Sequence, residues 1–162
     1  MYVIRQAMEK DLCAINDIYN WAVFNTTATF DLEKRTMEKA LEWFNVHQNE
    51  RYPLYVIEKE EIVGWGSLSP FNLRPAYRFT SEFSIYIDHK YHGKGLGGQL
   101  LAYLCHEGKK LDFHSLVGII SAENKASLGL AEKEGFIQVG YYKEVGYKFE
   151  RWLDVVIMQK MI

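Results

Sequence analysis

The chain of 162 residues contains only two cysteines, Cys13 and Cys105, which match neither a CxxC nor a zinc-binding spacing. Both fall in amphipathic helical patterns, so we expect two reduced thiols in the core rather than a disulfide. The five histidines add no ligand set, because the HxxH pair of His89 and His92 has no further ligand to complete it. We therefore predict no bound metal, and a chain of this size needs none to fold.

The sequence also lacks a long apolar segment and any cluster of basic residues. Arg5, Glu9, Lys10 and Asp11 interrupt the first residues and argue against a signal peptide. No apolar run approaches the roughly 20 residues of a membrane span. Because the net charge is −2 and the basic residues are scattered, the surface offers no path for a phosphate backbone. We expect a cytoplasmic protein that binds neither nucleic acid nor membranes.

The composition is that of a globular protein with a surplus of aromatic residues. Hydrophobic residues make up 48% of the chain and charged residues 25%, a balance that suits a buried core. No linker, repeat or low-complexity tract divides the sequence, so we predict a single domain over residues 1–162. The aromatic share of 15% is high enough that some of these side chains are expected to line a pocket.

Apolar periodicity predicts strands and helices in the order βααβββαβαββ. The predicted strands cover residues 3–6, 54–59, 62–68, 83–87, 116–121, 139–142 and 152–158. The predicted helices run from Leu12 to Val23, from an N-cap at Thr36 to Phe44, from Leu100 to Leu111, and from Asn124 to Glu134 before Gly135. Residues 25–31 and 69–80 are predicted loops. This order predicts an α/β (mixed α+β) fold, whose central mixed sheet is antiparallel at first, is parallel around residues 83–121, and has helices on both faces.

The most informative segment is a glycine-rich loop between a predicted strand and a predicted helix, His92-Gly93-Lys94-Gly95-Leu96-Gly97-Gly98. Glycines let the backbone approach a ligand closely and adopt positive φ. The first amides of the following helix have no internal partner, and the helix dipole favours negative charge there. The loop therefore suits an anion such as a pyrophosphate, with Lys94 as an additional cation.

Other interpretations of this loop remain. A P-loop would need a Ser or Thr after Lys94 to bind Mg²⁺, and the sequence has none there. Gly93, Gly95 and Gly98 satisfy the GxGxxG pattern of dinucleotide-binding folds, with Glu123 available as the ribose ligand. Such folds usually begin with βα repeats, however, whereas a block of strands precedes this loop, and too few residues follow it for a second nucleotide half together with a substrate domain. A flexible connection without a ligand is the remaining alternative.

Residues 92–97 resemble the pyrophosphate motif of the GNAT acetyltransferase superfamily, Gln/Arg-x-x-Gly-x-Gly/Ala, with His92 in place of the usual Gln or Arg. Residues 124–127, followed by 132–136, resemble the later motif of that superfamily, in which Asn contacts coenzyme A and Gly-Phe ends the helix. The resemblance implies that acetyl-CoA is held by Ile85, Tyr86, Ile87, His92, Gly93, Lys94, Gly95, Leu96, Gly97, Gly98, Asn124 and Ser127.

Further segments resemble the phosphinothricin and methionine sulfone (sulfoximine) N-acetyltransferase branch, and the resemblance covers nearly the whole chain. They are Tyr52-Pro53, Arg74-Pro75-Ala76-Tyr77, residues 82–87, Gly146-Tyr147-Lys148 and Trp152-Leu153-Asp154-Val155. The resemblance implies a GNAT-like, mostly antiparallel twisted sheet and a homodimer. It also implies transfer of acetyl from acetyl-CoA to the α-amine of a small amino-acid analogue, with Phe30, Arg74, Ala76, Tyr77 and Glu82 on the substrate side.

Acetyl transfer requires a neutral amine, so a base or a water relay must take a proton from it. Glu82, placed just before a predicted strand, matches the carboxylate that this family is thought to use, and partial burial would raise its pKa toward that task. A solvated glutamate at a strand end is the alternative. Backbone amides of Ile85–Ile87 would stabilise the oxyanion, and direct attack in a ternary complex needs no acetylated Cys105.

The general acid for the thiolate is missing from its family position, where Ala131 replaces a Tyr or His. Another group, such as Tyr141 or Tyr147, or solvent would have to supply that proton. Ala131 therefore also supports an alternative function, an acyl-CoA-binding regulatory module without turnover. An acetyltransferase of other amines, such as protein N-termini, is a further alternative.

Overall fold

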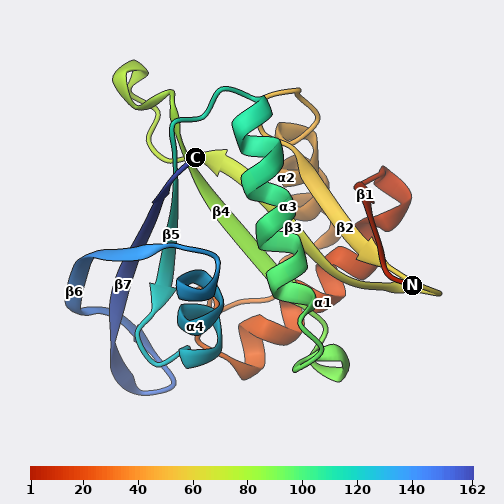
Figure 1. Ribbon diagram of the computed structural model, residues 1–162. Helices are drawn as coiled ribbons and strands as arrows, with labels where there is room; N and C mark the ends of the chain where they lie inside the picture. Colours follow the sequence, from red (N-terminus) through yellow and green to blue (C-terminus); the bar gives the residue numbers. More distant parts are fainter.

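The computed structural model describes residues 1–162 as one seven-stranded sheet with helices on both faces (Figure 1). The strands are β1 (Val3–Gln6), β2 (Leu54–Glu58), β3 (Ile62–Pro70), β4 (Thr80–Ile87), β5 (Ser115–Ser121), β6 (Ile137–Lys148) and β7 (Arg151–Met161). The helices are α1 (Leu12–Asn25), α2 (Met37–Val46), α3 (Leu96–Lys110) and α4 (Lys125–Lys133), and 3₁₀ turns span Glu9–Asp11, Pro75–Tyr77 and His89–Tyr91. The predicted order of strands and helices is confirmed.

The strand order across the sheet is β1-β2-β3-β4-β5-β7-β6. Every neighbouring pair is antiparallel except β4 and β5, which are parallel. The predicted mixed sheet is therefore confirmed, including its antiparallel first part and its single parallel step. That step joins β4 to β5 through α3, as a crossover between parallel strands requires.

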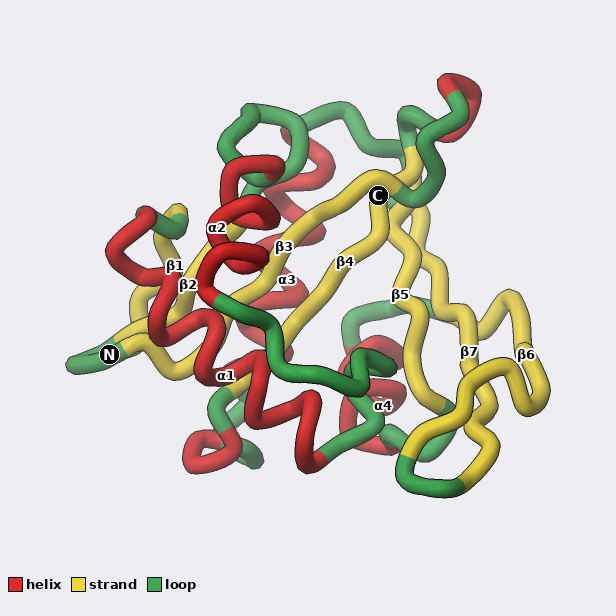
Figure 2. The backbone as a smooth tube through the Cα atoms, turned by 180° about the vertical axis from the view of Figure 1, so that it is seen from behind, coloured by secondary structure: helices red, strands yellow, loops and turns green.

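The two faces of the sheet carry separate cores, because successive side chains of a strand point to opposite sides. On one face, Phe83 of β4 belongs to a buried cluster with Leu104 of α3. On the other face, Trp65 of β3 belongs to a cluster with Ile15 of α1 and Phe44 of α2. Figure 2 is seen from the side of α1 and α2, with the loop between these helices crossing in front of the sheet.

Both cysteines are free thiols, but only one of them lies in the core. Cys105 is buried as predicted, whereas the prediction for Cys13 is wrong, since this residue is exposed. Leu12 and Ile15 point into the core from α1, and Cys13 falls on the outer side of that helix near Asp17. No group of three or more His, Cys, Asp or Glu side chains is placed to hold a metal ion. None of the helices combines the length and the apolar composition that crossing a membrane requires.

Local sequence signals set most of the element ends. Thr36 caps α2 as predicted, its side chain accepting a hydrogen bond from Lys39 N, and Gly135 follows α4 with a φ of +92°. Leu111 lies just beyond the end of α3. β6 extends past the predicted strand 139–142 at both ends, because most of its residues are exposed and show no apolar alternation.

Candidate active site

An opening between β4 and β5 interrupts the sheet. The two strands pair only from Thr80 opposite Ser115 to Glu82 opposite Val117, and they diverge beyond that point, as Figure 1 shows. From there to Ile87, β4 pairs with β3 alone. The edge of β4 that faces the opening therefore presents backbone groups that no other strand satisfies, and a ligand can pair with them.

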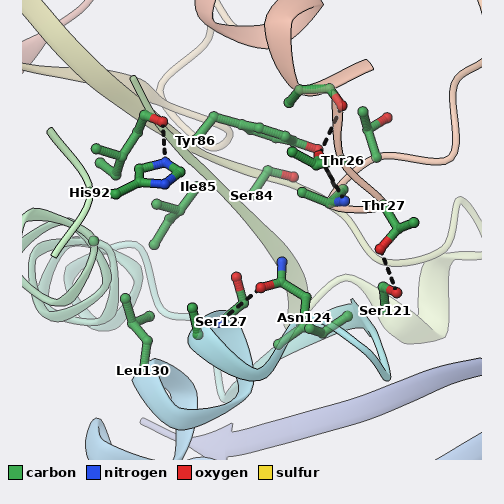
Figure 3. A pocket seen from close by; sticks show the side chains of 18 of the residues that line it. Thr26, Thr27, Ser84, Ile85, Tyr86, His92, Ser121, Asn124, Ser127 and Leu130 are labelled. Atoms are coloured by element: carbon green, nitrogen blue, oxygen red, sulfur yellow. Dashed lines mark hydrogen bonds between the residues drawn. The ribbon is translucent and has the colours of Figure 1, made fainter. Parts of the chain in front are cut away.

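A cavity of about 880 Å³ fills this opening, which is the size of cavity that holds a cofactor-sized ligand. Figure 3 shows Ser84, Ile85 and Tyr86 on one wall, with Asn124 and Ser127 on the other. The cavity is lined by most of the residues predicted from the sequence: Phe30, Glu82, Ile85, Tyr86, Ile87, His92, Gly93, Gly95, Leu96, Gly97, Asn124 and Ser127. The fold thus brings together segments that are far apart in the chain.

The glycine loop supplies an anion site at one end of the cavity. Gly93 and Gly95 have φ values of +76° and +74°, in the region that favours glycine. The first hydrogen bond within α3 runs from Gln99 N to Gly95 O at 3.2 Å, so the amides of residues 96–98 have no partner inside the helix. Free amides at the positive end of a helix dipole are suited to a diphosphate, so the residues present fit coenzyme A.

Other residues of this loop set its position. His92 Nε2 donates a hydrogen bond of 2.9 Å to Ile87 O and so ties the loop back to the end of β4. Gly97 allows α3 to approach α4, since a Cβ there would lie 2.6 Å from Leu130 Cδ1. Lys94 is exposed and does not line the cavity, so its contact with the cofactor stays a prediction.

Asn124 joins the start of α4 to the cavity. Its Oδ1 accepts a hydrogen bond of 3.2 Å from Ser127 N, which caps the helix. Because this bond fixes the amide orientation, the Asn124 Nδ2 group remains free to donate to a ligand. In Figure 3 its nitrogen points into the space below Tyr86 and Ser84.

Glu82 lies at the point where β4 and β5 part. It is the last β4 residue to pair with β5, inside the strand rather than just before it as the sequence suggested. Its side chain is half-buried, lines the cavity and forms no ion pair. Burial alone raises the pKa of its carboxyl group above the ordinary value of 4.5. A carboxylate in this setting is a stronger base than a solvated one.

The raised pKa of Glu82 predicts a pH-dependent effect on stability. The folded protein holds this proton more tightly than the unfolded chain, so the contribution of Glu82 to stability is fully present below its ordinary pKa and is lost as the pH rises through the raised value. Glu82→Gln is therefore expected to raise Tm by a few degrees at about pH 7 and to leave it unchanged at about pH 4. Thermal denaturation at both pH values checks this, and a lower Tm for the variant at the higher pH would contradict it.

The predicted substrate residues fall in two places. Phe30 lines the cavity, and its ring packs so closely on Gly146 that a Cβ there would overlap it. Arg74, Ala76 and Tyr77 are exposed in the loop between β3 and β4 and do not line the cavity of this chain. Their contact with a substrate stays a prediction.

The two tyrosines named from the sequence do not replace the missing general acid. Ala131 is completely buried and does not line the cavity. Tyr141 and Tyr147 do not line it either: the Tyr141 hydroxyl donates to Asp154, and the Tyr147 ring packs on Trp152. The proton sources that remain are solvent and the other protic side chains that line the cavity.

The Thr-rich loop of residues 26–30, from which the sequence predicts only Phe30 as a pocket residue, forms one whole wall of the cavity. Thr27 Oγ1 and Ser121 Oγ share a hydrogen bond of 3.0 Å across the opening. Lys148, in the Gly-Tyr-Lys segment, is buried and donates a bond of 2.8 Å from Nζ to Thr29 O. Burial lowers the pKa of this lysine. The sequence signals for this wall are the run of small polar residues and the resemblance at Phe30.

Comparison with known proteins adds a family and named relatives. The family model described as an acetyltransferase (GNAT) domain matches residues 4–157. A Salmonella typhimurium protein described as an L-methionine sulfoximine/L-methionine sulfone acetyltransferase is 36% identical over 157 residues, which cover 96% of this chain and 92% of that protein.

Solved structures share the fold over nearly the whole of this chain. A GNAT superfamily phosphinothricin acetyltransferase from Sinorhizobium meliloti, in complex with AcCoA, gives a TM-score of 0.96 at 32% identity, covering 99% of this chain and 88% of that one. A ribosomal-protein-alanine N-acetyltransferase from Brucella melitensis gives a TM-score of 0.96 at 38% identity and covers 99% of both chains. These matches include both walls of the cavity.

Proposed function

The chain belongs to the GNAT acetyltransferase family and is an acetyl-CoA-dependent N-acyltransferase, and we propose that it acetylates the α-amine of a small amino-acid analogue. The names of the Salmonella and Sinorhizobium relatives, which refer to methionine sulfoximine, methionine sulfone and phosphinothricin, support this substrate class. The observation that carries the proposal is Glu82, a half-buried carboxylate without an ion-pair partner beside a cavity that ends in a cradle of free helical amides.

Each end of the cavity has its own part in the reaction. The amides of residues 96–98 bind the diphosphate of acetyl-CoA, and Asn124 Nδ2 donates to the same molecule. The backbone amides of Ile85 and Ile87, on the edge of β4 that faces the opening, orient the thioester and donate a hydrogen bond to its carbonyl oxygen as negative charge develops there. Glu82 takes a proton from the substrate ammonium, so that the neutral amine can attack the carbonyl carbon.

Transfer takes place directly between the two bound substrates. Cys105, the one buried thiol, lies in the core and does not line the cavity. Burial raises the pKa of its thiol to about 11, which leaves almost no thiolate to act as a nucleophile. The amine itself therefore displaces the thiolate of coenzyme A, which takes its proton from solvent or from a protic side chain that lines the cavity.

A panel of acceptors tests the substrate class. Release of free thiol from acetyl-CoA would be measured with methionine sulfone, methionine sulfoximine, phosphinothricin, spermidine and a peptide with an N-terminal alanine. We expect turnover with the small amino-acid analogues and much slower or no turnover with the polyamine and the peptide. Turnover with the peptide alone would move the function to protein N-termini, and no turnover with any small amino-acid analogue would remove the proposed substrate class.

We further propose that the protein is a homodimer. The β6–β7 ribbon exposes a large apolar surface, which marks an interaction site more often than a solvated face: Tyr142, Val145, Tyr147, Phe149 and Trp152. Light scattering during size-exclusion chromatography is expected to give the mass of two chains, and Trp152→Lys is expected to give the mass of one. A wild-type protein with the mass of one chain would contradict the proposal.

A cytoplasmic location without nucleic-acid or membrane partners also stays a proposal. The scattered basic residues and the net charge of −2 support it. Fractionation of cells that produce a tagged chain is expected to recover it with the cytoplasmic proteins, and recovery with membranes or nucleic acid would contradict this expectation.

A further inference from the structure

A second, smaller cavity of about 250 Å³ lies next to the first. Its lining residues include Tyr19 of α1, Trp43 of α2 and Trp65 of β3, and Ser84 and Tyr86 line both cavities. Ser69, which lines the second cavity, pairs with Glu82 across β3 and β4. Paired residues project to the same face with Cβ atoms about 5 Å apart. An amine bound at Glu82 can therefore extend the rest of its molecule into the second cavity.

Arg35 is the one cation that lines this cavity, and its charge is incompletely satisfied. Its guanidinium carbon lies 4.3 Å from the ring centre of Tyr19 and 4.4 Å from that of Trp43, so the group is held between two aromatic rings. Nε donates to Asn16 Oδ1 at 2.7 Å, whereas Nη2 is buried and has no hydrogen-bond partner. Arg35 forms no ion pair with any carboxylate of the chain.

The backbone of Arg35 is fixed as firmly as its side chain. Arg35 N donates to Asn20 Oδ1 at 2.8 Å, and Arg35 O accepts from Nδ2 of both Asn16 and Asn20. These contacts join the start of α2 to α1 and hold the arginine in one place. A binding group that is already ordered loses little entropy when its ligand arrives.

The other polar groups of the cavity leave Arg35 Nη2 without an acceptor. Asp31 lines the same cavity and attracts the guanidinium electrostatically, but it forms no ion pair with Arg35, and its carboxylate accepts a hydrogen bond from the Tyr19 hydroxyl. Trp65 Nε1 is buried and, like Arg35 Nη2, has no partner. Two buried donors without acceptors are costly for a folded protein, unless a ligand supplies the acceptors.

We propose that this cavity binds an oxygen-bearing group of the acceptor amino acid, with Arg35 as its principal anchor. The group is either the α-carboxylate or the sulfonyl or phosphinate oxygens of the side chain, since all of these present oxygen acceptors to a guanidinium. The aromatic walls formed by Tyr19, Trp43 and Tyr86 enclose the carbon chain next to it. This inference rests on the proposed function and adds a residue that determines substrate specificity.

Kinetics of Arg35→Met and Arg35→Lys test the proposal. Methionine preserves the stacking between the rings but not the donors, so KM for methionine sulfone is expected to rise about 10- to 100-fold. The kcat value and KM for acetyl-CoA are expected to change little, and Arg35→Lys to recover part of the loss. Arg51→Met is the matched control, because Arg51 also packs on an aromatic ring, 4.4 Å from that of Phe113, but does not line either cavity.

Two further acceptors identify the bound group. If the α-carboxylate is bound, the loss in Arg35→Met disappears with methionine sulfone amide. If the sulfonyl oxygens are bound, the loss disappears with methionine, which lacks them. The proposal is overturned if KM for methionine sulfone is unchanged in Arg35→Met. It is also overturned if KM rises equally for all three acceptors and rises by the same factor in Arg51→Met.

A measurement of substrate binding without turnover separates this inference from the proposed function. Methionine sulfone would be titrated into the wild type and Arg35→Met while tryptophan fluorescence is recorded, since Trp43 and Trp65 line the cavity. Weaker binding to the variant supports the proposal even if no acetylation occurs, in which case only the proposed function fails. Equal binding to both proteins overturns the role of Arg35, whether or not the enzyme turns over.

Discussion

Glu82→Gln is expected to lower kcat by about 100-fold or more, because loss of a positioned general base costs on the order of 10²- to 10⁴-fold. Glutamine has nearly the same shape but cannot accept the ammonium proton, so the affinity for acetyl-CoA should not change. Steady-state kinetics and a calorimetric titration with acetyl-CoA measure both effects. In the wild type, kcat/KM is expected to rise with pH through a pKa above 4.5, and this acid limb should disappear in the variant.

Glu123→Gln is the matched comparison, since Glu123 is the other carboxylate that lines the main cavity. Glu123 is held by Arg151 at 2.5 Å, and this hydrogen bond lowers the pKa of its carboxyl group. A paired carboxylate with a lowered pKa is a poor base, so this change should cost far less activity than Glu82→Gln. Equal losses in the two variants would contradict the assignment of the base, and indifference to Glu82→Gln would favour a binding module without turnover.

Gly98→Asp is expected to weaken acetyl-CoA binding at least about 100-fold, because a carboxylate in the first turn of α3 repels the diphosphate at close range. The fold should tolerate the change. A Cβ at Gly98 meets no atom within 4 Å, and an acidic residue in the first turn of a helix stabilises it by about 0.3–1 kcal/mol. Calorimetry with acetyl-CoA and thermal denaturation measure the two effects separately.

Gly129→Asp controls for the added charge. Gly98 and Gly129 both lie outside the cavity lining, and a Cβ at either meets no atom within 4 Å, but Gly129 is in the middle of α4, away from the first turn of α3. Acetyl-CoA affinity should therefore be retained in this variant. If Gly98→Asp binds acetyl-CoA as tightly as the wild type, the amides at the start of α3 are not the diphosphate site.

The sequence predicted those parts of the structure that depend on local patterns of neighbouring residues. Apolar spacing located α1 and β4, and the glycines at 93 and 95 indicated a loop in which positive φ is needed. β6 was predicted too short because an exposed edge strand has no buried face to give alternation. The prediction for Cys13 was wrong because this residue lies beside the buried stripe of α1, where a shift of one position along the helix turns a side chain from the core to solvent.

The site was less predictable where it depends on contacts between distant segments. Residues 84–87, 93–97 and 124–127 were recognised together only through family motifs, because nothing in local spacing indicates that β4 and β5 diverge after Glu82. Arg35 gave no signal at all, since its surroundings combine α1, α2 and the centre of the sheet. Such an arrangement follows from the fold and not from periodicity.

The central claim is that acetyl moves directly from acetyl-CoA to an amino-acid amine while both are bound in the opening between β4 and β5. The most direct test measures initial rates with acetyl-CoA and the best amine of the panel both varied. Double-reciprocal plots are expected to give lines that intersect, as a ternary complex requires. Parallel lines, which indicate a covalent acetyl-enzyme, or the absence of any rate, would contradict the claim.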